Sequence, residues 1–170
     1  LPIHLRGWRG PGHLRWVHSI TSAHACGSVR WIRRLFVVEH VEEAEWFMKI
    51  DLDTYFFRDN FDRFIERKGW NGTQPLYFGH VLRHQANEAM VAGTASVLSQ
   101  ASLRTLGPRL LQIKNGTPHS LCKDKPGVEE SRVARCLRID GIHAQDAFDE
   151  LGRELFLILK VSFLVHSKPP

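Results

Sequence analysis

The apolar positions between residues 29 and 79 predict helices that alternate with strands. Helical spacing covers residues 29–41, and the compact apolar segment 46–50 predicts a buried strand. The apolar residues within 61–65 share one face of a second predicted helix, which Gly69 ends. Residues 75–79 then predict a short strand.

The second half of the chain continues the same alternation. Residues 90–98 predict a strand followed by a loop, and Ser99 is placed to cap a helix that Gly107-Pro108 ends. Residues 128–138 predict a further helix. Strands that alternate with helices are typical of an α/β layer architecture.

Charge divides the chain into a basic beginning and a balanced remainder. The net charge over 170 residues is +5, and residues 1–28 are rich in Gly, His, Arg and Trp without a clear period. We therefore expect an irregular basic segment over 1–28, a globular domain over 29–160 and a tail over 161–170. A basic segment can face phosphate, nucleic acid or an anionic membrane, or simply be solvated.

Cysteine usage and hydropathy restrict the class of protein only loosely. The three cysteines, Cys26, Cys122 and Cys136, include no C-x-x-C pair, which argues against a structural zinc site. Their number fits a cytosolic protein or a secretory protein with one disulfide. No apolar run is long enough to cross roughly 30 Å of hydrocarbon. Because the chain begins with Leu1 and not Met, we expect a piece of a longer protein.

Asp51 and Asp53 carry the most chemical information in the sequence. Side chains two positions apart along a strand point to the same side, so both carboxylates can face one divalent cation. Oxygen ligands suit a hard ion such as Mn²⁺ or Mg²⁺, which can also bind a diphosphate. A D-x-D pair also occurs in solvated turns, but the strand before it and Thr54-Tyr55 after it favour a metal site.

The segment around this pair resembles a known signature. Residues 46–55 read W-F-M-K-I-D-L-D-T-Y, which resembles the W-F-M-K-A-D-D-D-T-Y segment of core 1 β1,3-galactosyltransferases, relatives of the Fringe glycosyltransferases. Residues 75–79 resemble the family's P-I-Y-F-G, and residues 90–99 fall on its M-S-G-G-A-G-Y-V-L-S. Residues 122–156 match without a gap, with Asp146 and Asp149 on the family's D-S-R-D.

The resemblance implies a GT-A-like fold, N-terminally truncated here, in which a mixed sheet flanked by helices binds a nucleotide sugar. It implies inverting transfer of galactose from UDP-galactose to GalNAc on Ser or Thr of glycoproteins, the synthesis of the core 1 O-glycan. The implied cofactor is Mn²⁺ (or Mg²⁺). The implied setting is the Golgi lumen, with a type II membrane anchor outside this chain and no nucleic acid partner. The oligomeric state stays open, and a homodimer is one option.

The resemblance also assigns roles to individual residues. It gives Asp51 and Asp53 to the metal and the donor, and it gives Glu130 to the catalytic base. Gly93 lies in the family's glycine-rich segment, where glycine allows close approach of the backbone to the sugar or acceptor. His166 lies near the family's further metal-binding histidine.

Two further features concern covalent chemistry of the secretory pathway. The spacing of Cys122 and Cys136 matches the family's and implies a disulfide. Asn71-Gly72-Thr73 and Asn115-Gly116-Thr117 are N-glycosylation sequons, which matter only if the chain enters that pathway.

Three departures from the family keep a second interpretation open. Leu52 replaces the middle aspartate, Glu130 replaces the base aspartate, and Gly93 is the sole glycine of residues 92–95. These changes and the short N-terminal part favour a catalytically impaired relative, either a pseudoenzyme or a chaperone for an active galactosyltransferase. The retained D-x-D favours an enzyme. A nucleic-acid binder that uses the basic segment is the third alternative.

Overall fold

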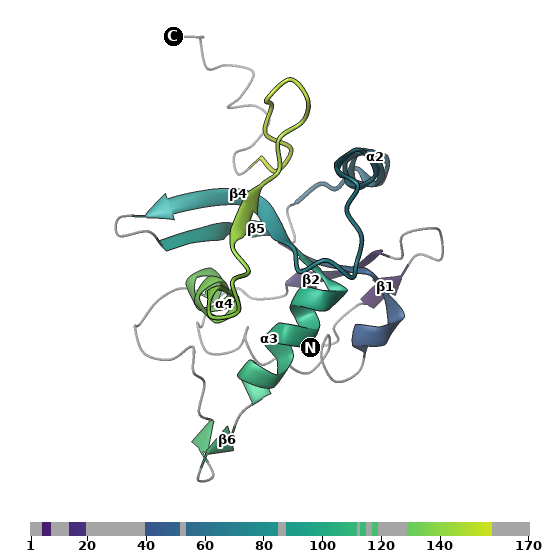
Figure 1. Cartoon of the computed structure of the whole chain (residues 1–170). Helices are drawn as coiled ribbons and strands as arrows, with labels where there is room; N and C mark the ends of the chain where they lie inside the picture. Colours follow the sequence, from purple (N-terminus) through teal and green to yellow (C-terminus); the bar gives the residue numbers. More distant parts are fainter. Residues whose placement is uncertain are drawn as a thin grey trace.

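The computed structural model describes residues 5–7, 14–19, 40–51, 54–84, 88–111, 113–114, 117–118 and 129–157. Within these ranges the chain forms a mixed sheet with helices on both faces (Figure 1). The mixed α/β class predicted from the sequence is therefore confirmed. The helix predicted over 29–41 lies almost wholly outside the described residues.

The described elements follow one another in this order: β1 (Leu5–Gly7), β2 (Leu14–Ser19), the 3-10 helix η2 (Val41–Glu43), β3 (Trp46–Asp51), α2 (Arg58–Lys68), β4 (Tyr77–His84), β5 (Glu88–Ser99), α3 (Gln100–Leu111), β6 (Ile113–Lys114), β7 (Thr117–Pro118), α4 (Glu129–Arg138) and β8 (Ala144–Asp146). The main sheet has six strands in the order β1-β2-β3-β5-β4-β8. The β2–β3 and β4–β8 pairs are parallel, and the other neighbours are antiparallel. Strands β6 and β7 form a separate two-stranded ribbon.

The prediction that residues 1–28 are irregular is wrong for two segments of them. Strand β2 pairs in parallel with β3 from Leu14↔Trp46 to Ser19↔Asp51, and β1 pairs with β2. The sequence of these segments has no clear period, yet they form strands because they pair with a neighbouring strand. Strand formation depends on such pairing more than on intrinsic preference. The sheet therefore continues beyond β3 on the N-terminal side of the D-x-D strand.

Strand β5 contains a bulge at residues 92–95. Its register with β4 moves from Gly79↔Ser96 to Val81↔Val91, so these four residues lie opposite a single residue of β4. The loop predicted within residues 90–98 is thus a bulge inside strand β5. Gly79 has a φ of 157°, and a Cβ there would lie 2.8 Å from the Ala95 carbonyl oxygen and closer still to Val91, so glycine is needed at this crossing.

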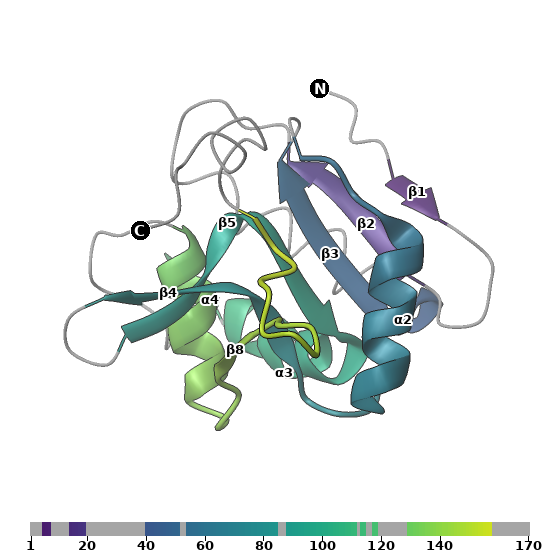
Figure 2. The same ribbon diagram turned by 90° about the horizontal axis from the view of Figure 1, so that it is seen from above.

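The sheet separates two apolar clusters. Figures 1 and 2 show α2 on one side of the sheet and α3 and α4 on the other; we call these sides the α2 face and the α3/α4 face. Side chains alternate along β3, so Trp46, Met48 and Ile50 pack on the α2 face while Phe47 packs on the other. The α2 cluster is aromatic: its buried rings belong to Trp46, Phe61, Phe64 and Phe78.

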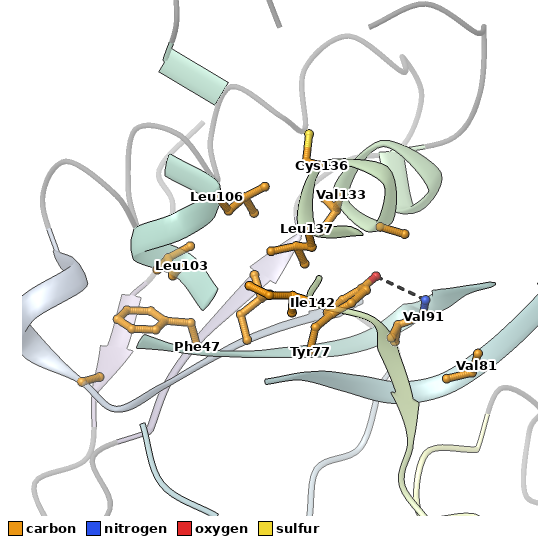
Figure 3. Packing of buried hydrophobic residues seen from close by; sticks show 13 residues of the cluster. Phe47, Tyr77, Val81, Val91, Leu103, Leu106, Val133, Cys136, Leu137 and Ile142 are labelled. Atoms are coloured by element: carbon orange, nitrogen blue, oxygen red, sulfur yellow. Dashed lines mark hydrogen bonds between the residues drawn. The ribbon is translucent and has the colours of Figure 1, made fainter. Parts of the chain in front are cut away.

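The α3/α4 cluster joins both helices to the sheet. Figure 3 shows Leu103 and Leu106 of α3 and Leu137 of α4 directed toward Phe47 and Tyr77 of the sheet. The Tyr77 hydroxyl accepts a hydrogen bond from the Val91 backbone N–H at 3.2 Å, so this buried polar atom is satisfied.

The helix ends agree with the sequence at two places and differ at one. Gly69 ends α2 with a φ of 62°, as predicted. Ser99 caps α3, because its hydroxyl accepts the Ser102 N–H at 3.1 Å. The prediction that Gly107-Pro108 ends α3 is wrong, since the helix continues to Leu111. Pro108 removes one backbone bond, but Leu103 and Leu106 hold the helix on the core.

Candidate functional site

The predicted metal ligands are described only in part. Asp51 is the last residue of β3, and its backbone pairs with Ser19 of β2. Asp53 and His166 lie outside the described residues, as does the Asp51 side chain. Among the side chains that are described, no group of three or more His, Cys, Asp or Glu could hold a metal ion. The metal site therefore stays a prediction that rests on the chemistry of the two aspartates.

Glu130, the predicted base, contacts the strand that ends in Asp51. It is the second residue of α4, and its Oε1 accepts a hydrogen bond from Lys49 Nζ on β3 at 3.1 Å. The side chains of Lys49 and Glu130 are only 11% and 19% exposed. A carboxylate in the first turn of a helix is also favoured by the helix dipole. The fold thus places Glu130 against the strand that carries Asp51, two residues beyond Lys49.

Gly93, which is predicted to let the backbone approach the sugar or acceptor, lies directly beside Glu130. A Cβ at Gly93 would lie 3.1 Å from Glu130 Cδ and closer still to Oε1. The absence of a side chain in the β5 bulge therefore provides the space that the Glu130 carboxylate occupies. Approach of a sugar to Gly93 stays a prediction.

A third contact ties the segment after the D-x-D to the same bulge. Thr54 follows Asp53 directly, and its hydroxyl donates a hydrogen bond to the Thr94 carbonyl oxygen at 3.0 Å. The end of β3, the β5 bulge and the first turn of α4 are therefore adjacent. The three parts come from positions separated by 40 and 81 residues along the chain.

Lys49 is the member of this site that the sequence interpretation missed. It occupies a position of β3 between two buried apolar residues, and its own side chain is largely buried. The signal was a lysine inside an otherwise apolar strand, because a buried charge needs a partner. The sequence alone could not identify that partner, which lies 81 residues away.

An apolar pocket of about 520 Å³ lies on the opposite face of β3. Its lining comes from β3, residues 54–57, α2, one residue of β5 and residues 155–157: Met48, Ile50, Thr54, Tyr55, Phe56, Phe57, Asn60, Phe61, Phe64, Ala95, Leu155, Phe156 and Leu157. A smaller pocket of about 360 Å³ lies between α2 and residues 148–155. Glu130 lines neither of these two pockets.

Asp146 and Asp149, which fall on the family's D-S-R-D, make local contacts. Asp146 accepts the Val81 N–H at 3.3 Å and pairs with Arg83. Asp149 accepts the backbone N–H groups of Arg153 at 2.8 Å and Leu151 at 2.9 Å. The Arg153 N–H is the main cause that lowers the pKa of the Asp149 carboxyl. Both residues thus organise the chain around β8.

Cys136 lies on α4, is fully buried and is disulfide-bonded. The cysteine proposed as its partner, Cys122, is outside the described residues, so the pairing stays a prediction. In the part of the chain that the structure describes, no helix is long and apolar enough to cross a membrane.

Comparison with known proteins identifies a similar galactosyltransferase. No protein-family model matches the chain. The chain is 29% identical over 118 residues to glycoprotein-N-acetylgalactosamine 3-beta-galactosyltransferase 1 of Xenopus laevis. The match covers 69% of this chain and 30% of the length of that relative. The similarity to core 1 β1,3-galactosyltransferases is thereby confirmed.

Proposed function

Because the chain is homologous to a core 1 galactosyltransferase, we propose that it forms part of a UDP-galactose-dependent glycosyltransferase. Its reaction would be inverting transfer of galactose to GalNAc linked to Ser or Thr of a glycoprotein. The observation that carries the proposal is the contact of Glu130 with the strand that ends at Asp51, in a chain with this homology. Within this proposal the fold is GT-A-like, which the mixed sheet with helices on both faces supports.

Glu130 is the proposed general base. In an inverting displacement the acceptor hydroxyl oxygen forms a bond to C1 of galactose while the bond from C1 to the UDP oxygen breaks. The hydroxyl proton must leave during this step, and a positioned carboxylate can take it. The contacts with Lys49 and Gly93 support this role because they fix the carboxylate beside the end of β3.

Asp51 and Asp53 are the proposed ligands of Mn²⁺ (or Mg²⁺), with His166 as a further candidate. Carboxylate oxygens are the donors that such ions prefer, and the pair follows directly from a strand in the middle of the sheet. When bound, the ion would stabilise the negative charge on the departing diphosphate. Thr54 would keep the segment after Asp53 against the bulge through its bond to Thr94.

The setting that goes with this activity is the Golgi lumen, with a membrane anchor outside this chain. The disulfide at Cys136 supports an oxidising compartment. The relative is named for its action on glycoprotein N-acetylgalactosamine, and we carry that acceptor to this chain as part of the proposal.

The test is calorimetric titration of the full chain with UDP, with and without Mn²⁺. We expect Mn²⁺-dependent binding that is lost in Asp53→Ala and retained in Asp59→Ala, an exposed acid on α2 that serves as a matched control. Loss of binding in both variants would point to general charge effects. Absence of UDP binding by the unaltered chain would instead favour the catalytically impaired relative.

A further inference from the structure

We propose that Lys49 and Gly93 are positioning residues for Glu130, a role that rests on the proposed function. Lys49 Nζ lies 3.1 Å from Glu130 Oε1, and a Cβ at Gly93 would collide with the same carboxylate. One residue attracts the carboxylate and the other leaves the space that it fills. Together they fix the base at the end of β3.

The burial of Lys49 supports this role. The lysine is 11% exposed on a strand whose other described side chains are apolar and buried, so its charge has lost most of its hydration. Largely buried ion pairs are poor sources of stability, because desolvation offsets much of the attraction. A contact that contributes little stability, and that holds the proposed base, is best explained by its effect on geometry.

Gly93 leaves the space that the long side chain of Glu130 occupies. The longer side chain carries its carboxylate into the β5 bulge, where the distance from an ideal Gly93 Cβ to Glu130 Cγ is 3.6 Å and to Cδ is 3.1 Å. An aspartate has its carboxyl carbon at the Cγ position, so its carboxylate would end one methylene short of the Glu130 carboxylate, and a methyl group at position 93 should meet it less closely. Glycine at 93 and glutamate at 130 therefore match each other.

The first test compares turnover of UDP-galactose with a GalNAc-peptide acceptor in Lys49→Met, Lys49→Arg and the surface control Arg104→Met, which breaks the exposed pair with Glu42. We expect kcat to fall on the order of 10²-fold in Lys49→Met, since a shift of about 1 Å costs that much. Arginine should restore most of the loss, and UDP affinity should not change. A loss confined to UDP binding, or unchanged kcat in Lys49→Met, would overturn the role.

The second test is a double-mutant cycle between positions 93 and 130. Gly93→Ala should lower kcat on the order of 10²-fold in the unaltered chain but have little effect in the Glu130→Asp background. Equal losses in both backgrounds would overturn the match.

A third measurement tests the contact of Lys49 with Glu130 without any assay of turnover. The Tm shifts of Lys49→Met and Glu130→Gln are compared with the shift of the double variant, and we expect them not to add. If the shifts are non-additive in a chain that transfers no sugar, the proposed function fails but the contact stands; additive shifts would overturn the contact itself.

A separate observation leads us to propose that Asn71 carries an N-linked glycan. Asn71 and Thr73 of the sequon are exposed, and the Thr73 hydroxyl donates a 2.6 Å hydrogen bond to Asn71 Oδ1. Gly72 between them packs on Glu45, next to the first residue of β3, whereas Asp51 is the last. At the usual rise per residue of a strand, these ends are roughly 16–17 Å apart. A glycan on Asn71 would therefore project into solvent away from the proposed reaction edge.

In this modification Asn71 Nδ2 bonds to C1 of the glycan as the C1–oxygen bond to a lipid diphosphate donor breaks, and the amide nitrogen loses a proton. The test directs the full chain through the secretory pathway of cultured cells. We expect a mass shift that peptide N-glycosidase removes, that is absent in Asn71→Gln and Thr73→Ala, and that persists in Asn115→Gln. A secreted chain whose Asn71 peptide is unglycosylated would overturn the site.

Discussion

The two faces of strand β3 differ in kind. On the α2 face, Trp46, Met48 and Ile50 pack among the aromatic rings of α2 and β4. On the α3/α4 face, Phe47 is buried in an aliphatic cluster, but the next position on that side is Lys49, paired with Glu130. One face follows the hydrophobic pattern throughout. The other departs from it at Lys49, two residues before the D-x-D begins.

This difference indicates where stability and chemistry separate. Buried apolar contacts on the α2 face lower the free energy of the folded state directly. A largely buried ion pair gives little net stability, because the loss of hydration offsets the attraction. Within the proposed function, the charges on the α3/α4 face serve the reaction more than the stability of the fold.

Placing a lysine on the α2 face of β3 should have the largest effect on the free energy of unfolding. Met48 is fully buried on the α2 face, so Met48→Lys would bury an unpaired ammonium group. We expect a loss of at least roughly 4 kcal/mol in the free energy of unfolding, measured by urea denaturation. A loss below about 1 kcal/mol would show that the α2 face tolerates charge and that the comparison is wrong.

Truncation of a side chain in the aromatic cluster should have the second largest effect on the free energy of unfolding. Phe78 is fully buried and its ring packs against the rings of Phe61, Phe64 and Trp70. We expect Phe78→Ala to cost about 3–5 kcal/mol, because the cavity adds to the lost transfer energy. The matched change on the other face, Leu137→Ala, should cost about 2–4 kcal/mol by the same measurement.

Replacement of both charges should have a much smaller effect on stability. We expect Lys49→Met combined with Glu130→Leu to change the free energy of unfolding by less than about 1 kcal/mol. Sugar transfer should be lost in the same protein. A destabilisation of several kcal/mol would mean that the ion pair is structural.

The smallest expected effect on stability concerns its pH dependence and Asp149, which lies in the segment beside α2. Backbone N–H groups lower the pKa of Asp149 in the folded state, so the stability that they provide is present above the unfolded pKa and is lost as pH falls through the folded pKa. Asp149→Asn should therefore lower Tm at neutral pH, and its difference from the unaltered chain should shrink below about pH 4. A difference in Tm that stays constant from pH 2 to pH 7 would contradict the role of the ionised Asp149 carboxylate as a hydrogen-bond acceptor.

The sequence predicted those elements whose signal is local. Strand β3 and helix α4 followed from apolar spacing, and the cap at Ser99 followed from the residue type. Strands β1 and β2 did not, because their formation depends on pairing with β3 more than on their own pattern. The continuation of α3 past Pro108 likewise depends on tertiary packing.

The site was predictable in its residue types but not in its arrangement. The family resemblance pointed to Glu130 and Gly93, and the structure brings these two together. Lys49 was missed because its partner is remote in sequence, and no local pattern encodes that contact. The positions of the two aspartate side chains stay a prediction.

The most direct measurement is the rate of galactose transfer from UDP-galactose to a GalNAc-peptide by the full chain and by Glu130→Gln. Removal of a general base lowers turnover by about 10²–10⁴-fold, so we expect a fall of that size with Mn²⁺-dependent UDP binding retained. Equal transfer by the two proteins would contradict the assignment of the base. Absence of transfer by the unaltered chain would contradict the proposed enzyme itself.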